Sequence, residues 1–153
     1  MREYKDRGVA SLIQLHETHM RRFIVVWRDA QAQGIALPET EDPDYGSMEK
    51  LLFHVVRSAR GYMVWMCEVL GLPDPGMAAV PSIDHIEAEI DQYLDKILEQ
   101  WQEPLHDVDS SWLDRDVYRS SWGVLYCIDS MLEHAVMHPI RHTYQLENLM
   151  QRA

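Results

Sequence analysis

Residues 122–151, WGVLYCIDSMLEHAVMHPIRHTYQLENLMQ, decide the fold of this chain. Their apolar side chains recur every three or four positions, which is the period of an amphipathic α-helix. Ser120 or Ser121 precedes the stretch, and a serine at that point can accept a hydrogen bond from a first-turn amide. The pattern therefore predicts one long C-terminal helix that buries one of its faces.

Three further segments have the same period, and glycines and prolines separate them. The pattern predicts helices over residues 3–33, 48–70 and 83–102. Ser47 and Ser82 are expected to cap the second and third helices. Residues 104–120 have no clear period, apart from a weak strand pattern near 116–120. Four amphipathic helices predict an all-α four-helix bundle, and the spacing between them predicts long inter-helix loops.

The composition is that of one globular domain spanning residues 1–153. Hydrophobic residues make up 46% of the chain and charged residues 25%, which are ordinary values. Lys and Arg total 14 against 25 Asp and Glu, so the formal charge is −11. That charge argues against nucleic acid and against an anionic membrane surface as partners. No apolar run approaches the roughly 18 residues that a membrane-spanning helix needs.

Two cysteines, Cys67 and Cys127, stand far apart in apolar surroundings. One disulfide between them is an alternative. However, the N-terminal segment lacks the apolar core of a secretion signal, and this favours reduced thiols. We therefore expect a cytoplasmic protein.

The eight histidines are the unusual feature of the composition, and three of them share a helix face. His134, His138 and His142 are four residues apart, so each is offset from the last by only about 40°. Two imidazoles at this spacing can bind one metal ion. His54 is the best candidate for a further ligand, because it lies within the apolar run LLFHVV, where a polar side chain needs a partner. Gln145 lies on the same face as the three histidines.

Structural alternatives for these histidines stay open. The three on one helix face could form a solvated or pH-sensitive cluster, and His54 could be a hydrogen-bonded core residue. The first helix is expected to bury a stripe that includes Leu15, His19 and Phe23. The remaining histidines share no clear pattern and are expected to be structural or exposed; they are His16, His19, His85 and His106.

Several other chemistries are excluded by spacing. The chain has no HExxH zinc motif, no Gly-rich phosphate loop, no GxSxG elbow and no CxxC pair. A di-iron bundle needs Glu-x-x-His on two helices. The one such spacing here, from Glu103 to His106, contains Pro104. No haem attachment motif is present, so a haem carrier is the least favoured alternative.

Two of the predicted helices carry motifs that resemble those of the DinB-like (YfiT-like) superfamily of metal-dependent bundle proteins. One motif is SMEKLLFH, residues 47–54, followed by Tyr62 and Trp65. The other is HPIRHTYQL, residues 138–146. The resemblance covers essentially the whole chain in helix order, loop lengths and total length. The metal ligands that it implies are His54, His138 and His142.

The chain departs from the family pattern within the second motif. Thr143 and Tyr144 replace the Arg-Gly pair that follows the last ligand in the family, so no role of that pair carries over. Gln145 matches the family glutamine. His134 and Gln145 could each contact a metal ligand on the side that faces away from the ion, or act as a fourth ligand. His134 could also form part of the pocket wall. Pro139 removes a backbone donor and is expected to kink or widen the helix.

The resemblance implies a function built on the metal site. Zn is the expected ion and Ni the alternative, because imidazole suits both. Some family members are thiol-dependent transferases or isomerases that use bacillithiol, mycothiol or glutathione. A small-molecule substrate, a low-molecular-weight thiol and a homodimer are therefore expected. Tyr62, Trp65 and Trp122 are candidates for the pocket wall, with a core position as the alternative for each.

Two other functions are weighed against the thiol transferase. One is a metal-dependent hydrolase, which would use the ion to activate water. The other is a non-catalytic metal-binding or structural dimeric bundle. An enzyme predicts an open coordination position that faces a cavity, whereas a structural site predicts a fourth protein ligand.

Overall fold

The structure is a computed structural model that describes residues 3–153. Within those residues the chain is mostly helical, which confirms the predicted all-α class. Its long helices are α1 (Arg7–Ala32), α2 (Met48–Val69), α3 (Ile86–Trp101) and α4 (Ile128–Arg152). Its short elements are the 3-10 turns η1 (Pro43–Tyr45) and η2 (Ser110–Trp112) and the paired strands β1 (Tyr118–Arg119) and β2 (Leu125–Tyr126). Over this part of the chain, none of the helices combines the length and the apolar character that crossing a membrane requires.

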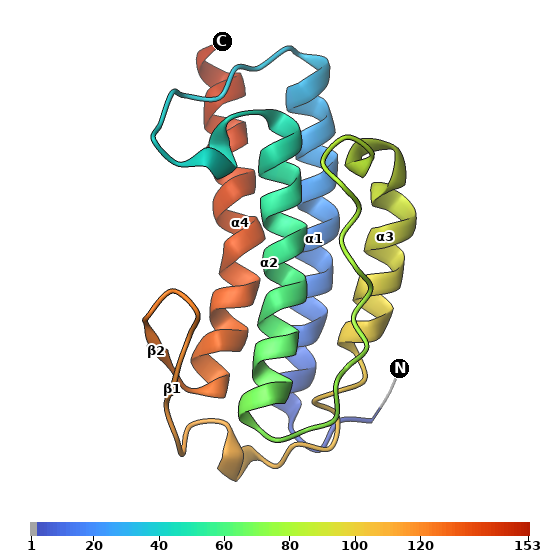
Figure 1. The fold of residues 1–153 in the computed structure, drawn as a ribbon, viewed down its shortest axis with the longest axis vertical. Coiled ribbons are helices and arrows are strands. Elements are labelled where there is room, and N and C mark those ends of the chain that lie inside the picture. Colours follow the sequence, from blue (N-terminus) through green and yellow to red (C-terminus); the bar gives the residue numbers. More distant parts are fainter. Residues whose placement is uncertain (1–2) are drawn as a thin grey trace.

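The four long helices lie side by side along the longest axis of the molecule (Figure 1). α1 and α4 run in one direction, and α2 and α3 run in the opposite direction. α2 and α3 can be parallel because residues 71–85 form an extended connection that runs back along the length of the bundle. α1 packs most extensively against α4, while α2 contacts each of the other three helices.

Side chains of α2 and α3 fasten this extended connection to the bundle. Arg60 on α2 donates from Nε to the carbonyl of Ala78 at 3.1 Å. Gln100 on α3 accepts the N–H of Ala78 at 2.9 Å and donates to the carbonyl of Gly76 at 2.8 Å. These contacts satisfy backbone groups that secondary structure leaves unpaired, and so they hold a proline-rich segment in place.

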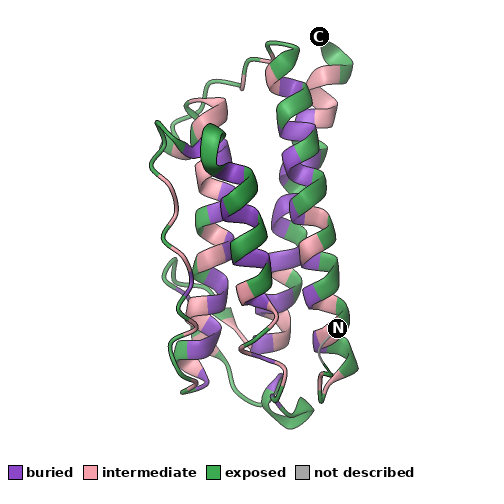
Figure 2. Ribbon diagram, turned by 90° about the vertical axis from the view of Figure 1, so that its right-hand side faces the viewer, coloured by how far each residue is buried: buried purple, intermediate pink, exposed green. Residues whose placement is uncertain are grey.

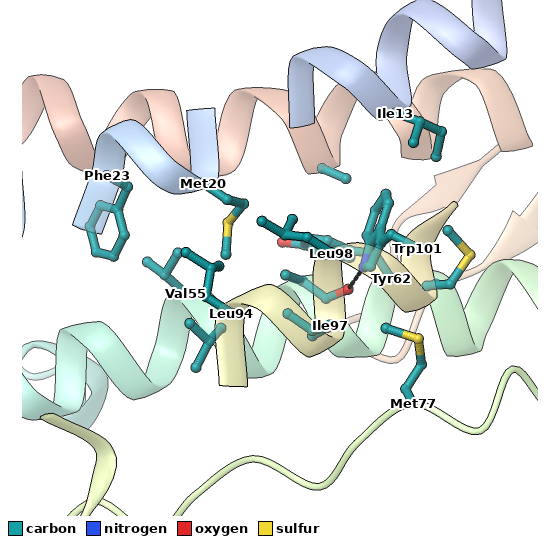
Figure 3. Packing of buried hydrophobic residues seen from close by; sticks show 14 of the residues in the cluster. Ile13, Met20, Phe23, Val55, Tyr62, Met77, Leu94, Ile97, Leu98 and Trp101 are labelled. Carbon is teal, nitrogen blue, oxygen red and sulfur yellow. Dashed lines mark hydrogen bonds between the residues drawn. The ribbon is translucent and has the colours of Figure 1, made fainter. Parts of the chain in front are cut away.

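Buried residues lie on the helix faces that point into the bundle, and exposed residues lie on the outside (Figure 2). Most of the buried residues are apolar. All four helices contribute to this core, and Met77 of the extended connection packs into it as well. Figure 3 shows part of the core around Trp101. The Trp101 indole N–H donates to the carbonyl of Ala59 at 3.1 Å, so the ring is buried without an unpaired donor.

α1 and α3 begin later than the sequence pattern indicates. α1 starts at Arg7 rather than at residue 3, because the carboxylate of Asp6 accepts a first-turn amide at 2.9 Å and caps the helix there. α3 starts at Ile86 rather than at residue 83, and the hydroxyl of Ser82 contacts a histidine ring at 3.3 Å instead of capping it. The predicted cap at Ser47 is confirmed, because its hydroxyl accepts a first-turn amide of α2 at 3.2 Å.

α1 also buries a different stripe from the one expected. Leu15 is 45% exposed and His19 is only half-buried, whereas His16 is fully buried. The observed stripe keeps a spacing of three or four residues over five turns, which outweighs the shorter pattern through Leu15. It runs through Val9, Ile13, His16, Met20, Phe23 and Trp27.

α4 begins at Ile128, and residues 118–126 form a hairpin where the sequence predicted the first turns of this helix. Gly123 in the hairpin turn has a φ of +89°, a left-handed conformation that an α-helix cannot contain. The hydroxyl oxygen of Ser120 accepts the N–H of Val124 at 3.1 Å, so this serine closes a turn instead of capping α4. The weak strand pattern near residues 116–120 is confirmed by β1.

Both cysteines are free. Cys127 caps α4, since its sulfur accepts the N–H of Ser130 at 3.4 Å. Cys67 is buried in the core, and burial, followed by the charge of Asp74, raises the pKa of its thiol to about 11. The Cys67 thiol is therefore protonated at neutral pH and serves as an apolar core side chain.

Candidate metal centre

Three imidazoles meet between α2 and α4. His54 is on α2, and His138 and His142 lie one turn apart on α4. The Nε2 atom of His138 is 3.0 Å from that of His54 and 3.4 Å from that of His142. Ligand atoms of all three rings lie within 4.8 Å of one another, so the group could hold a metal ion. The three histidines that the sequence singled out are therefore brought together.

α4 continues as helix through Pro139. The proline has no N–H to donate to the preceding turn, but its own carbonyl accepts the hydroxyl of Thr143 at 2.8 Å. The approach of His138 and His142 shows that the four-residue spacing still places both rings on one side of the helix. The expected kink stays a prediction.

Asp44 fixes the ring of His54 from outside the cluster. Its Oδ2 atom lies 2.8 Å from Nδ1 of His54 and 3.2 Å from Nη2 of Arg57. A carboxylate accepts hydrogen bonds, so Nδ1 of His54 carries the hydrogen and the electron pair of Nε2 faces the other two rings. Sequence reasoning missed Asp44, because it lies in a breaker-rich loop without a period. Its only signal was its position three residues before the helix cap Ser47.

Gln145 has the same relationship to His142. Its Oε1 atom lies 2.9 Å from Nδ1 of His142. The amide oxygen accepts the Nδ1 hydrogen and leaves the Nε2 electron pair directed at the cluster. Gln145 therefore supports His142 from the far side of its ring, which is one of the two roles that the sequence left open.

Burial keeps the imidazoles on α4 neutral. The pKa of His138 is lowered to about 2, first by burial and then by the charges of the neighbouring imidazoles and Arg141. The pKa of His142 is lowered to about 4, first by burial and then by the charge of His54. Neutral imidazole is the form that binds a metal ion, so no proton has to be displaced from either ring at neutral pH.

The cluster holds too few hydrogens to satisfy its own nitrogens. With Asp44 and Gln145 accepting the Nδ1 hydrogens of the two outer rings, only His138 can supply a hydrogen between the three Nε2 atoms. It can donate that hydrogen to one neighbour, which leaves the Nε2 of the other neighbour an acceptor without a donor. A tetrahedral ion with nitrogen ligands at about 2.05 Å would separate those nitrogens by about 3.3 Å. The observed 3.0 Å and 3.4 Å fit this arrangement.

A cavity of about 580 Å³ opens onto the three imidazoles. Tyr62, Trp65 and Trp122 are among the residues that line it. Trp65 also anchors the hairpin, because its indole N–H donates to the carbonyl of Arg119 at 3.2 Å and its ring meets Tyr118 edge-on. The hairpin thus forms one wall of the cavity, with Trp122 at its turn.

His134 lies in the wall of this cavity and outside the group of three. Its ring stacks on Trp122 with centroids 5.8 Å apart, and Tyr62 meets it edge-on at 5.3 Å. The centroid of His138 is 6.3 Å away. Burial, followed by the charge of Arg141, lowers the pKa of His134. Of the roles considered for His134, the structure gives it that of a wall residue.

The other four histidines lie away from the cluster. His16 is buried in the core against Trp101, and His19 is half-buried on α1. His85 lies exposed at the start of α3, and His106 contacts Asp107 at 3.0 Å. None of them belongs to the group of residues that could hold a metal ion.

Comparisons with protein-family models, with curated proteins and with solved structures find no match to this chain. The site itself therefore provides the evidence for function. Its elements are three imidazoles with converging nitrogens, an outer hydrogen-bond partner for each of two rings, and an adjoining cavity.

Proposed function

We propose that this chain is a divalent-metal-binding protein of the DinB-like type, with His54, His138 and His142 as the ligands of a catalytic ion. The observation that supports this most strongly is the convergence of three Nε2 atoms, with the electron pairs of His54 and His142 directed into the cluster. Buried imidazoles without such a partner would leave acceptors unpaired, at a cost of about 1–3 kcal/mol each. Zn is the ion that we favour and Ni is the alternative, because both suit imidazole ligands.

The adjoining cavity favours an enzyme over a structural site. Structural zinc sites are closed by four protein ligands, whereas catalytic sites have three and leave a position open. Within residues 3–153 the group that could hold an ion contains three histidines, and His134 packs against aromatic rings instead of joining it. The cavity of about 580 Å³ gives a small molecule room beside that open position.

Among enzymes, we propose a thiol-dependent transferase that uses bacillithiol, mycothiol or glutathione. When bound, a divalent ion with an open position would lower the pKa of a thiol or polarise a substrate oxygen. In the transfer the thiol sulfur forms a bond to an electrophilic carbon. The leaving group departs with its electron pair, and the thiol proton passes to solvent.

The charge distribution around the cavity favours the transferase over the hydrolase. Hydrolysis benefits from a carboxylate that removes a proton from the attacking water. No Asp or Glu is among the described residues that line the cavity. Asp44 contacts a proposed ligand, but its carboxylate is already engaged by His54 and Arg57. A thiol activated at the ion needs no such base.

The chain's own residues would hold the ligand rings in position and line the cavity in which the substrate binds. Asp44 and Gln145 hold two of the rings in place, so the ligand nitrogens need little rearrangement on binding. Tyr62 and Trp122 line the cavity beside the site and present apolar surface to a bound molecule. A homodimer, which the family resemblance implies, stays a prediction.

Metal analysis of variants tests the ligand set. Purified protein loaded with Zn or Ni and then desalted should retain close to one ion per chain. His54→Ala and His142→Ala should each reduce the bound metal strongly, and the double variant should abolish it. His85→Ala is the matched control, because this exposed imidazole is remote from the cluster. If the double variant bound one ion with unchanged affinity, the ligand assignment would be wrong.

A second assay separates the three functions. Metal-loaded protein is incubated with an electrophile, such as 1-chloro-2,4-dinitrobenzene, and each of the three thiols. Conjugation that depends on both thiol and metal, and that His142→Ala abolishes, supports the transferase. Metal-dependent ester hydrolysis without thiol would indicate the hydrolase instead. Full metal binding with neither activity would favour the non-catalytic alternative.

A further inference from the structure

The cavity beside the imidazoles is positively charged in a protein of strongly negative charge. The chain carries a formal charge of −11 from 25 acidic and 14 basic residues. Among its described residues, however, those that line this cavity include two arginines and no aspartate or glutamate. A bound divalent ion would add further positive charge. A cavity of this kind attracts a negatively charged ligand.

The two arginines, Arg57 and Arg141, differ in what they contact. Arg57 pairs with Asp44 at 3.2 Å and lies over the ring of Phe53 at 5.6 Å, so its charge is largely compensated. Arg141 is exposed and forms no hydrogen bond or ion pair with any residue of the range 3–153. Arg141 nevertheless lines the cavity, so its charge is available to a ligand there.

The wall formed by the hairpin and the adjoining turns of α2 and α4 offers flat apolar surface. Trp122 is 48% exposed although its ring touches Tyr62, Tyr126 and His134. An exposed indole held by aromatic neighbours presents a rigid face on which a planar group can stack. The cavity thus combines an uncompensated guanidinium with an aromatic wall and the open side of the imidazole cluster.

We propose that this cavity binds a small aromatic carboxylate, whose carboxylate pairs with Arg141 and whose ring packs against Trp122. A carboxylate matches one guanidinium, because the two form a pair of parallel hydrogen bonds. Among the residues that line the cavity, a phosphate dianion would find no second uncompensated cation, because Arg57 is already paired. The inference rests on the proposed function in so far as it names the class of substrate for that site.

Ligand titration of the metal-free protein tests this class directly. The probes are benzoate and indole-3-acetate, and their neutral counterparts are benzamide and indole-3-acetamide. Binding is followed by NMR chemical shifts and calorimetry. Each acid should bind at least about ten-fold more tightly than its amide, because a charge-assisted hydrogen bond is lost in the amide. The same titration on Zn-loaded protein should give equal or tighter binding of the acids.

Three variants separate the two parts of the site. Arg141→Gln should remove most of the preference for acid over amide, and Arg141→Lys should keep part of it. Trp122→Ala should weaken the acid and the amide to a similar extent and leave their ratio unchanged. Arg7→Gln removes one exposed positive charge at the start of α1, and it should change neither affinity nor preference.

The outcomes distinguish this inference from the metal assignment. Equal affinities for acid and amide, or an unchanged preference in Arg141→Gln, would overturn the carboxylate site even in a protein that binds metal. Failure to bind metal, together with a preference abolished by Arg141→Gln, would overturn only the proposed function and would support the carboxylate site.

Discussion

Oδ2 of Asp44 lies 2.8 Å from Nδ1 of His54, so a residue of the loop before α2 determines which nitrogen of a helix residue faces the cluster. The same carboxylate oxygen contacts Arg57 at 3.2 Å. This one oxygen atom therefore contacts both the ring of His54 and the guanidinium of Arg57. The orientation of the His54 ring depends on the position of Asp44 and on the contact of Asp44 with Arg57.

Asp44→Ala should weaken metal binding while all three imidazoles remain. Loss of the outer hydrogen bond frees the His54 ring and lowers the basicity of its Nε2, and such changes cost about 10- to 100-fold in metal affinity. Competition with a chelator of known affinity measures the loss. Asp44→Asn keeps an acceptor without the charge, so its loss should be smaller. Glu41→Gln, in the same exposed loop, should leave the affinity unchanged.

Gln145→Ala should also weaken metal binding, but less than Asp44→Ala does. The amide oxygen of Gln145 is uncharged and its side chain is exposed, so water can replace it beside Nδ1 of His142. The two variants are compared in the same competition assay. A loss in Gln145→Ala as large as that in Asp44→Ala would contradict the argument from charge and burial.

His16→Phe should stabilise the protein. The ring of His16 is 1% exposed and stacks on Trp101 with centroids 3.7 Å apart, but neither of its nitrogens has a hydrogen-bond partner. Phe can keep the stacking and removes the unpaired polar atoms. Urea unfolding should show a gain of about 1–3 kcal/mol at neutral pH. His19→Phe is the control, because His19 is only half-buried and should give no comparable gain.

His16 should also make the free energy of unfolding depend on pH. Burial, followed by the charge of His19, lowers the pKa of His16 from 6.5 to about 3. Above pH 6.5 the ring is neutral in both the folded and the unfolded protein. As the pH falls towards 3, only the unfolded chain gains the proton, and stability is lost by about 1.4 kcal/mol per pH unit. The advantage of His16→Phe over the wild type should therefore grow from pH 6.5 down to pH 3, and a constant difference would contradict this.

Trp65→Phe should loosen the hairpin without unfolding the bundle. The substitution removes the hydrogen bond to the carbonyl of Arg119 and keeps a ring against Tyr118. Amide hydrogen exchange should become faster over residues 118–126 and stay unchanged in α1 and α3. Faster exchange throughout the chain would show that Trp65 supports the core instead. Trp112→Phe, an exposed tryptophan of η2, serves as the matched control.

Much of the fold could be predicted from sequence because helical periodicity is a local signal. All four helices were expected, and the cap of α2 was found at Ser47. The start of α4 was misplaced because residues 122–127 are apolar enough to extend the helical pattern. The positive φ of Gly123 and the side-chain hydrogen bond of Ser120 made the segment a hairpin instead. Turn chemistry of this kind outweighs a short apolar period.

The candidate site could be predicted only where it lies on helices. His138 and His142 follow from a four-residue spacing, and His54 from its apolar surroundings. Asp44 could not be found in this way, because a loop residue acquires its position from tertiary packing. The stripe expected on α1 included His19 instead of His16, because the apolar period of α1 can be read in two registers and only packing against α3 selects one.

The hairpin affects which molecules can enter the cavity, but it does not hold the imidazole cluster in place. Its turn, residues 121–123, carries Trp122 into the cavity but contributes no ligand to the imidazole cluster. Insertions or replacements in this exposed turn would reshape the entrance while α2 and α4 keep the three rings in place. Exchange of a few turn residues would therefore change which molecules fit the cavity and leave the imidazole cluster unchanged.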